Sequence, residues 1–319
     1  MKKLLCLILA VAAMLCVVSC GEEPVYEKGT KFYSVTTRIS TAAKETEQRH
    51  YYDASGKLVL TEVFPFDIQK EKVVAKDPTE TIVYTYDDAG NLATKTTTVA
   101  SSGAVTKLSY EYDDDNNVIK YTKDDAGKIE TYTYTYVDGR LTIETYETSV
   151  SVSGETSPVT QLNVTTYTYE SEDSLNCKYE TVVTLSYAGQ QTVYNLSGHK
   201  TYDERGQVFS KAGEGASNIT VKSVTVDGAT YKSPFADITY ESNKYRYIYD
   251  DTNDFDGDGK KDSVIVKINT YSEWDDLLST ERYLYDDYGN LLSYKQFKPS
   301  DNSVIYAEVN TFSPDSPRK

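Results

Sequence analysis

The sequence has very few of the residues on which many catalytic and metal centres depend. Among its 319 residues are two histidines, four cysteines, two methionines and one tryptophan. Neither His50 nor His199 lies in a recognisable motif, which argues against a histidine-based zinc site and against a Ser-His-Asp triad. Trp274 could anchor a ligand, but a core or cross-strand position is the simpler interpretation.

Helical patterning is also missing. Beyond the N-terminal segment, apolar residues do not recur every 3.6 residues over any useful length, which argues against amphipathic helices. Leu, Met and Ala are scarce, whereas the 30 tyrosines and the many threonines and valines favour strands. We therefore predict an all-β fold, with a sheet whose faces are covered by tyrosine and threonine because the aliphatic content is too thin for a deep core.

Positive charge is outweighed by negative charge. The chain has 33 Lys and Arg against 49 Asp and Glu, for a formal net charge of -16 at pH 7. A chain this acidic repels nucleic acid and anionic lipid headgroups, so we expect no nucleic-acid partner and a tolerance for cations.

The N-terminus has the layout of a secretory signal. Two lysines precede an apolar run from Leu4 to Val18, which is too short to span a bilayer comfortably. The run ends in "VVSC", which resembles a bacterial lipobox and implies cleavage before Cys20 and lipidation of its thiol. Residues 1–19 are thus a predicted lipoprotein signal peptide and residues 20–32 an acidic linker. An ordinary signal peptide with a chance cysteine is the alternative.

Cleavage before Cys20 would also determine which cysteines remain in the mature protein and where that protein is located. Cys6 and Cys16 would leave with the signal and Cys20 would carry the lipid, so Cys177 alone would remain and no intramolecular disulfide could form. The sequence "CGEEP" resembles the acidic export tag of surface lipoproteins in Bacteroidetes-type bacteria. The predicted location is the outer membrane, by a lipid anchor, with exposure at the cell surface left open.

A short motif, Tyr-Asp-x-x-Gly-x followed by Leu, Val or Ile, recurs along the chain. The aspartate can accept hydrogen bonds from the amides of its own turn, and the glycine can take the left-handed conformation that closes a type I turn with a bulge. Asn117 is expected to replace the glycine in the third copy, and Asp138-Gly139 to form a two-residue type I′ turn in the fifth. The predicted turn residues are Asp53 and Gly56, Asp87 and Gly90, Asp113 and Asn117, Asp124 and Gly127, Asp138 and Gly139, Asp203 and Gly206, and Asp286 and Gly289.

The segments between these turns alternate like antiparallel strands. From Thr131 to Tyr136, tyrosines fall on one face and threonines on the other. The turn spacing predicts a four-stranded meander over residues 108–147.

The same pattern extends over residues 33–312, which we predict to be one β domain. It is an antiparallel β-hairpin meander that forms a twisted sheet, with rolling or doubling left open. Residues 148–160 mark a possible seam, and residues 313–319 a polar tail.

The repeated motif resembles the YD repeats of the RHS family, which build a long spiral of hairpins that can form a shell around a toxin. The copies in this chain are few and irregularly spaced. The resemblance therefore implies the hairpin geometry and a small YD-repeat lipoprotein, not a shell with cargo.

The most acidic stretch is "DFDGDGKKD", residues 254–262. Calcium prefers six to eight oxygen ligands, and alternating carboxylates on a tight loop can converge on one such ion. Gly259 permits the sharp turn behind the third carboxylate. The predicted ligands are Asp254, Asp256, Asp258, the carbonyl of Lys260, and Asp262.

The context of this stretch excludes one calcium-binding class. Ile265 stands where a helical calcium loop needs a glutamate, and the flanks are strand-like, so it is not an EF-hand. It resembles the calcium loop of FG-GAP and VCBS repeats, in a single copy, which implies a structural Ca²⁺. A fully coordinated ion has no open position for catalysis. A solvated acidic turn is the alternative.

These features together predict a non-catalytic, lipid-anchored outer-membrane protein that binds or scaffolds through a tyrosine-rich sheet. The membrane is its expected partner through the anchor, and a glycan or a protein its expected ligand. A glycan-processing enzyme is a competing class, although no carboxylate pair stands out as acid and base. A purely structural stalk is another.

Overall fold

The structure is a computed structural model. It describes residues 34–41, 45–67, 69–151, 158–187, 190–214, 218–219, 223–226, 229–232, 238–239, 243–254, 261–272, 274–287 and 289–313. The predicted signal peptide, the predicted lipidation site Cys20, the whole predicted linker, residues 314–319 of the predicted tail and three of the predicted calcium ligands (Asp256, Asp258 and Lys260) lie outside these residues.

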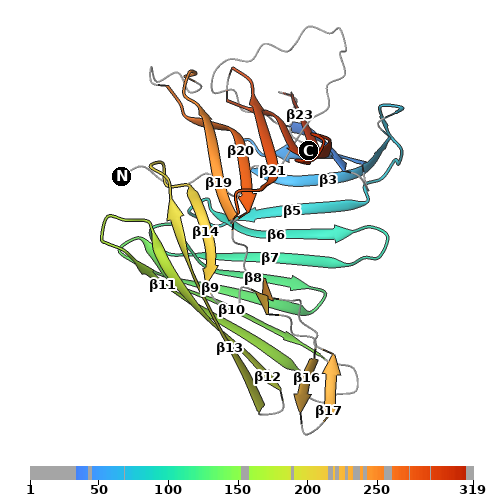
Figure 1. Cartoon of the computed structure of the whole chain (residues 1–319). Helices are drawn as coiled ribbons and strands as arrows, with labels where there is room; N and C mark the ends of the chain where they lie inside the picture. The colour runs from blue at the N-terminus through green and yellow to red at the C-terminus, as the bar shows by residue number, and fades with distance from the viewer. Residues whose placement is uncertain are drawn as a thin grey trace.

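The all-β prediction is confirmed, and the strands form one large antiparallel meander (Figure 1). Its first half contains β1 (Ser34–Thr41), β2 (Glu45–Tyr52), β3 (Leu58–Asp67), β5 (Glu80–Tyr86), β6 (Leu92–Val99), β7 (Val105–Tyr112), β8 (Val118–Asp125), β9 (Lys128–Val137) and β10 (Arg140–Val150). Its second half contains β11 (Val159–Tyr169), β12 (Cys177–Tyr187), β13 (Gln190–Tyr202), β14 (Val208–Glu214), β19 (Asn243–Asp250), β20 (Val264–Ser272), β21 (Leu277–Tyr285), β22 (Leu291–Phe297) and β23 (Val304–Ser313).

The described residues also contain five shorter strands besides these 18. The two-residue strand β4 (Lys72–Val73) pairs with β3. Two small hairpin-like pairs stand apart from the large sheet. They are β15 (Asn218–Ile219) with β18 (Ile238–Thr239), and β16 (Ser223–Val226) with β17 (Ala229–Lys232).

Pairing follows chain order along two runs. Strands β5 to β14 each pair with the next, and so do β19 to β23. The first run continues through β3 to β2 and β1, and β1 pairs with β23, so the two runs share one end. Their other ends meet at β14 and β19, where two residue pairs are registered. The curled sheet is therefore not closed by a full ladder at this β14–β19 join.

Of the predicted seam, residues 148–151 and 158–160 are described. Strands β10 and β11 pair without a shift from Ile143–Thr166 to Val150–Val159, so the described strand residues on either side belong to one continuous ladder. The four-stranded meander expected over residues 108–147 matches β7 to β10.

On β9 the two faces of the sheet differ in exposure, as the alternating sequence predicts. On β9, Tyr132, Tyr134 and Tyr136 are half-buried, whereas Thr133 and Thr135 are exposed. Directly paired residues point to the same side, so the register carries the tyrosine side across the sheet. We call this side the tyrosine face and the other side the opposite face.

Fully buried side chains gather in two zones. One lies on the tyrosine face of β11 to β13, around Tyr167, Cys177 and Tyr179. The other lies on β1, β3 and β23 and includes Val63 and Val309. In the described residues of β5 to β9, which run between the zones, every side chain is half-buried or exposed. The middle of the sheet is thus a single layer, as the thin aliphatic content predicts.

Candidate functional site

The repeat turns share one hydrogen-bond pattern. In the first copy, the amide of Asp53 donates to the carbonyl of Lys57 (2.8 Å), and the amide of Gly56 donates to the carbonyl of Asp53 (2.9 Å). The Asp53 carboxylate accepts from the amides of Ser55 and Lys57, and Gly56 has φ 82°. The same backbone pair recurs at Asp87, Asp113, Asp203 and Asp286.

Two turns differ from the sequence-based prediction. In the third copy the left-handed residue is Asn116, with φ 62°, and not Asn117. Asn117 instead donates its side-chain amide to the Asp113 carboxylate (2.9 Å). The prediction was wrong by one position because the turn counts three residues from the aspartate, as the glycine-containing copies do.

The fourth copy is a tighter turn than predicted. Asp125 pairs with Lys128, which leaves Ala126 (φ 51°) and Gly127 (φ 92°) as a two-residue turn. Asp124 lies before that turn, and its carboxylate accepts from the Gly127 amide (2.9 Å). The two-residue turn at Asp138-Gly139 has positive φ at both residues, as a type I′ turn requires.

Antiparallel pairing places almost all repeat turns at one end of the sheet, which we call the repeat end. The turns that follow β2, β5, β7, β9, β13 and β21 lie there, and so does the acidic turn between β19 and β20. The Asp124 copy follows β8 and lies at the opposite end. The sequence motif alone did not distinguish it from the others.

The tyrosine that precedes the aspartate in a repeat has a role that sequence reasoning missed. Its hydroxyl donates to a backbone carbonyl in the preceding hairpin. That carbonyl belongs to the first or second residue of the strand that follows the preceding hairpin's turn. Three such bonds are present among the described residues: Tyr86 to Leu58 (2.8 Å), Tyr112 to Leu92 (3.0 Å) and Tyr285 to Ile265 (3.2 Å). Tyr169, which precedes Glu170 instead of an aspartate, donates to the carbonyl of Leu141 in the same way (2.9 Å). Each tyrosine thus ties its own hairpin to the hairpin before it.

The bond from Tyr285 to Ile265 shows how the acidic turn relates to the repeats. Ile265 follows the acidic turn and accepts from Tyr285 just as Leu58 accepts from Tyr86. Asp250 begins the turn, and its carboxylate accepts from the amide of Thr252 (2.9 Å), as Asp53 does from Ser55. The acidic turn occupies a repeat position in an enlarged form.

Of the predicted calcium ligands, only the first and the last are described. Asp254 is half-buried, and the amide of Asp262 donates to the carbonyl of Asn253 (2.7 Å), which brings the two ends of the turn together. Groups of three or more His, Cys, Asp or Glu able to hold a metal are absent from the described parts of the chain. The calcium site stays a prediction, because three of its ligands lie outside them.

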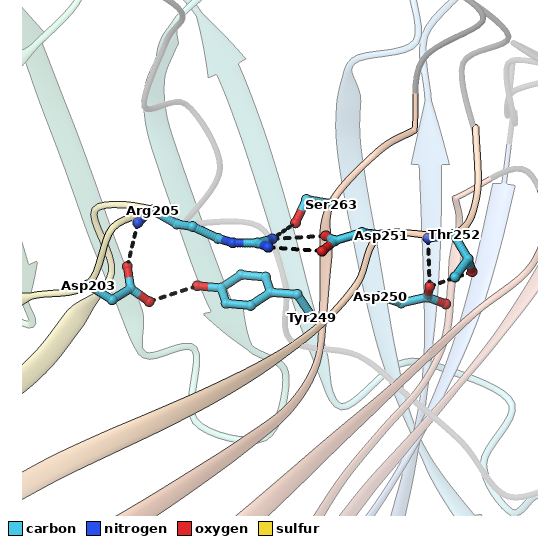
Figure 2. Close-up of polar contacts among 7 residues, drawn as sticks. All are labelled: Asp203, Arg205, Tyr249, Asp250, Asp251, Thr252 and Ser263. Atoms are coloured by element: carbon cyan, nitrogen blue, oxygen red, sulfur yellow. Dashed lines mark hydrogen bonds and ion pairs between the residues drawn. The ribbon is translucent and has the colours of Figure 1, made fainter.

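A side-chain cluster joins the acidic turn to the repeat turn before β14 (Figure 2). Arg205 donates to both carboxylate oxygens of Asp251 (2.9 Å each) and to the hydroxyl of Ser263. Its guanidinium lies 4.0 Å from the ring centre of Tyr249, whose hydroxyl donates to Asp203 (3.1 Å). Arg205 holds the pKa of Asp251 well below its usual range.

Cations also cover the rings of Tyr86, which belongs to a repeat, and of Tyr169, which does not. Lys57 lies 4.8 Å from the ring centre of Tyr86, and Arg140 lies 5.2 Å from that of Tyr169. In both cases the cation comes from the preceding turn, so the contact supports the same link between neighbouring hairpins as the hydroxyl bond.

Tyrosine rings stack across the strands of the tyrosine face. Tyr110, Tyr121, Tyr132 and Tyr146 form a ladder with ring centres 5.2, 5.4 and 4.8 Å apart. Burial, together with the neighbouring ring hydroxyls, raises the pKa of Tyr110 to about 12, so its hydroxyl is neutral at physiological pH. Because these rings are packed against each other, they offer edges and hydroxyls rather than free ring faces.

A second ladder contains a fully buried acid. Tyr283, Tyr294 and Tyr306 have ring centres 5.1 and 5.7 Å apart, and Tyr306 donates its hydroxyl to Glu308. Glu308 is 0% exposed, and its Oε2 has no hydrogen-bond partner among the described residues. Burial raises the pKa of this carboxyl to about 7. Tyr283 donates to Glu281 (2.6 Å) on the same face.

The structure also shows the surroundings of three other residues from the sequence analysis, His50, Cys177 and Trp274. His50 contacts the hydroxyls of Thr61 (2.8 Å) and Thr37 (3.0 Å), and burial lowers its pKa to about 4. Cys177 is buried beside Tyr179, as a small apolar residue would be. The expected core or cross-strand position of Trp274 is wrong, because it lies 80% exposed in the turn between β20 and β21.

Comparisons with known proteins give structural similarities alone. No protein-family model matches the sequence, and no curated protein matches it. The chain is similar to the crystal structure of a porin-like protein from Bacteroides uniformis ATCC 8492, at TM-score 0.39 and 12% identity, covering 91% of this chain and 100% of that one.

It is also similar to the crystal structure of TcdB2-TccC3 without its hypervariable C-terminal region, at TM-score 0.31 and 15% identity. That similarity covers 88% of this chain and 15% of the other, so the chain spans a small part of that protein's length. With TM-scores below 0.5, neither similarity extends the properties of those proteins to this chain. Among the described residues, no helix is long and apolar enough to cross a membrane.

Proposed function

We propose that this chain is a non-catalytic outer-membrane lipoprotein, anchored through Cys20, that binds or scaffolds a polar ligand through its tyrosine face. The observation that supports this most is the ladder of Tyr110, Tyr121, Tyr132 and Tyr146. A row of neutral hydroxyls about one strand spacing apart offers repeated hydrogen-bond donors. A glycan or a polar protein surface carries the matching acceptors.

The test is a glycan and protein binding screen on the mature chain with Cys20→Ser. Removing the ladder hydroxyls in Y121F/Y132F keeps the ring stack and should weaken binding. T133V removes a hydroxyl from the exposed opposite face and should leave binding unchanged. Equal affinities for all three proteins would contradict recognition by the tyrosine face.

The anchor is tested separately from binding. The native chain should partition with outer membranes and carry a lipid at Cys20, and Cys20→Ser should release it into the soluble fraction. Membrane attachment that survives this substitution would contradict the lipid anchor.

The calcium ion is proposed as a structural part of the acidic turn. A site held at about a hundred times its dissociation constant adds about 2.7 kcal/mol to stability. Binding of the ligand should be the same with calcium and with chelator once the fold is intact. Ligand binding that requires calcium in a fully folded protein would assign the ion to recognition.

A glycan-processing enzyme is the competing class, and Glu308 is the group that raises it. A carboxyl with a pKa of about 7 suits a general acid. However, the Glu308 side chain is 0% exposed, so a substrate cannot reach it in this conformation. Glycan hydrolysis that is lost in E308Q would favour this class over a binding role.

A further inference from the structure

Among the 18 longer strands, the β14–β19 join is the weakest link of the large sheet. It registers two residue pairs, Ser210 with Lys244 and Lys211 with Asn243. By comparison, β12–β13 registers 11 pairs and β1–β23 registers eight. Since local opening begins where few backbone hydrogen bonds must break, this join should open before its neighbours.

The Arg205 cluster crosses this same join at the repeat end. Arg205 and Asp203 belong to the turn that leads into β14, whereas Tyr249, Asp251 and Ser263 belong to the ends of β19 and β20 (Figure 2). Side chains therefore connect the β13–β14 hairpin to the β19–β20 hairpin beyond the point where the backbone ladder between β14 and β19 ends.

Cations over tyrosine rings elsewhere in the sheet are not needed to the same extent to hold neighbouring hairpins together. Lys57 over Tyr86 and Arg140 over Tyr169 also bridge neighbouring hairpins. In those places the strands between the turns pair along longer ladders, with four residue pairs between β3 and β5 and eight between β10 and β11. At the β14–β19 join the ladder is shorter, so the connection depends more on the side-chain cluster, in which Arg205 contacts Asp251, Ser263 and Tyr249.

We propose that the curled sheet opens and closes at the β14–β19 join, with Arg205 as the latch. The latch is suited to reversible release because both partners of its ion pair are exposed, Arg205 at 42% and Asp251 at 53%. Water and salt compete with exposed ion pairs, so each contact is individually weak. The carboxylate that accepts from Arg205 belongs to Asp251, at the start of the acidic turn. A rearrangement of that turn therefore acts directly on the join.

Hydrogen exchange of the mature chain tests the proposal. In R205A, amides of β14 and β19 should exchange roughly tenfold faster, while those of β12 and β13 keep their protection. R246A is the matched control, because Arg246 lies over the Tyr271 ring (4.9 Å) within the β19–β20 hairpin and does not cross the join. Unchanged exchange of β14 and β19 in R205A, or the same change in R246A, would overturn the latch.

A disulfide separates opening at the join from general unfolding. Ser210 and Lys244 are directly paired, at a separation that a disulfide can bridge. In R205A/S210C/K244C, oxidation should restore the protection of β14 and β19, and reduction should remove it again. Persistent fast exchange in the oxidised protein would show that Arg205 acts on the fold as a whole and would refute the proposal.

Discussion

Replacing Glu308 with glutamine should change how the stability of this protein depends on pH. Glu308 lies on the tyrosine face of β23, is 0% exposed, and has one oxygen without a partner among the described residues. Ionising a carboxyl in such a place is unfavourable, and burial raises its pKa from the ordinary 4.5 to about 7. Glutamine has nearly the same shape as the protonated acid and cannot ionise.

The sign and size of the effect follow from proton linkage. Between pH 4.5 and 7 the folded state holds a proton that the unfolded state has lost. The stabilisation is therefore fully present below pH 4.5 and is lost as the pH rises through 7. From pH 5 to pH 8 the loss at this one group is about 2.5 kcal/mol.

The assay is thermal and denaturant unfolding of the native sequence and of E308Q at pH 5 and pH 8. Relative to the native sequence, E308Q should gain about 2.5 kcal/mol on going from pH 5 to pH 8, or roughly 5–10 °C in Tm. E111Q removes one charge from the exposed opposite face and controls for net charge. If the native sequence and E308Q respond identically to pH, the carboxyl is not held neutral by burial and the reasoning is refuted.

Three further predictions concern the turns and their links. Y112F should lose about 1 kcal/mol in denaturant unfolding, because its hydroxyl no longer donates to the Leu92 carbonyl, and a loss no greater than in Y132F would contradict this. A126N should gain about 0.5–1 kcal/mol in the same assay, since Ala126 has φ 51° and Asn-Gly suits a type I′ turn; a lower Tm would contradict it. Chelator should lower the Tm of the mature chain, and an unchanged Tm would exclude a structural ion in the acidic turn.

Local features of the fold could be predicted from the sequence because their causes lie within a few residues. In most repeats the aspartate carboxylate accepts hydrogen bonds from amides of its own turn, and the alternation of Tyr132 and Thr133 decides which side chain faces which side. Two errors arose: one position was miscounted in a turn of ordinary length, and one turn that shares the motif is shorter than the others. Asn116 rather than Asn117 is left-handed, and Ala126 joins Gly127 in a two-residue turn.

The functional arrangement was less predictable, because it depends on which hairpins become neighbours. The bond from Tyr112 to Leu92 spans 20 residues, and the Arg205–Asp251 pair spans 46. A tyrosine directly before most of the repeat aspartates was visible in the sequence, but the acceptor of its hydroxyl was not. The burial of Glu308 and the exposure of Trp274 likewise depend on which segments cover them.

The sequence by itself determined an all-β hairpin meander, with tyrosine and threonine on opposite sides and turns at the repeated aspartates. These follow from strand propensity, side-chain alternation and turn chemistry, which act over short stretches of chain. The tertiary structure alone decided that the meander curls until β23 meets β1 and β14 meets β19. The physical reason is that twist and stagger accumulate over 18 strands, so strands far apart in the sequence become neighbours only when the whole sheet is assembled.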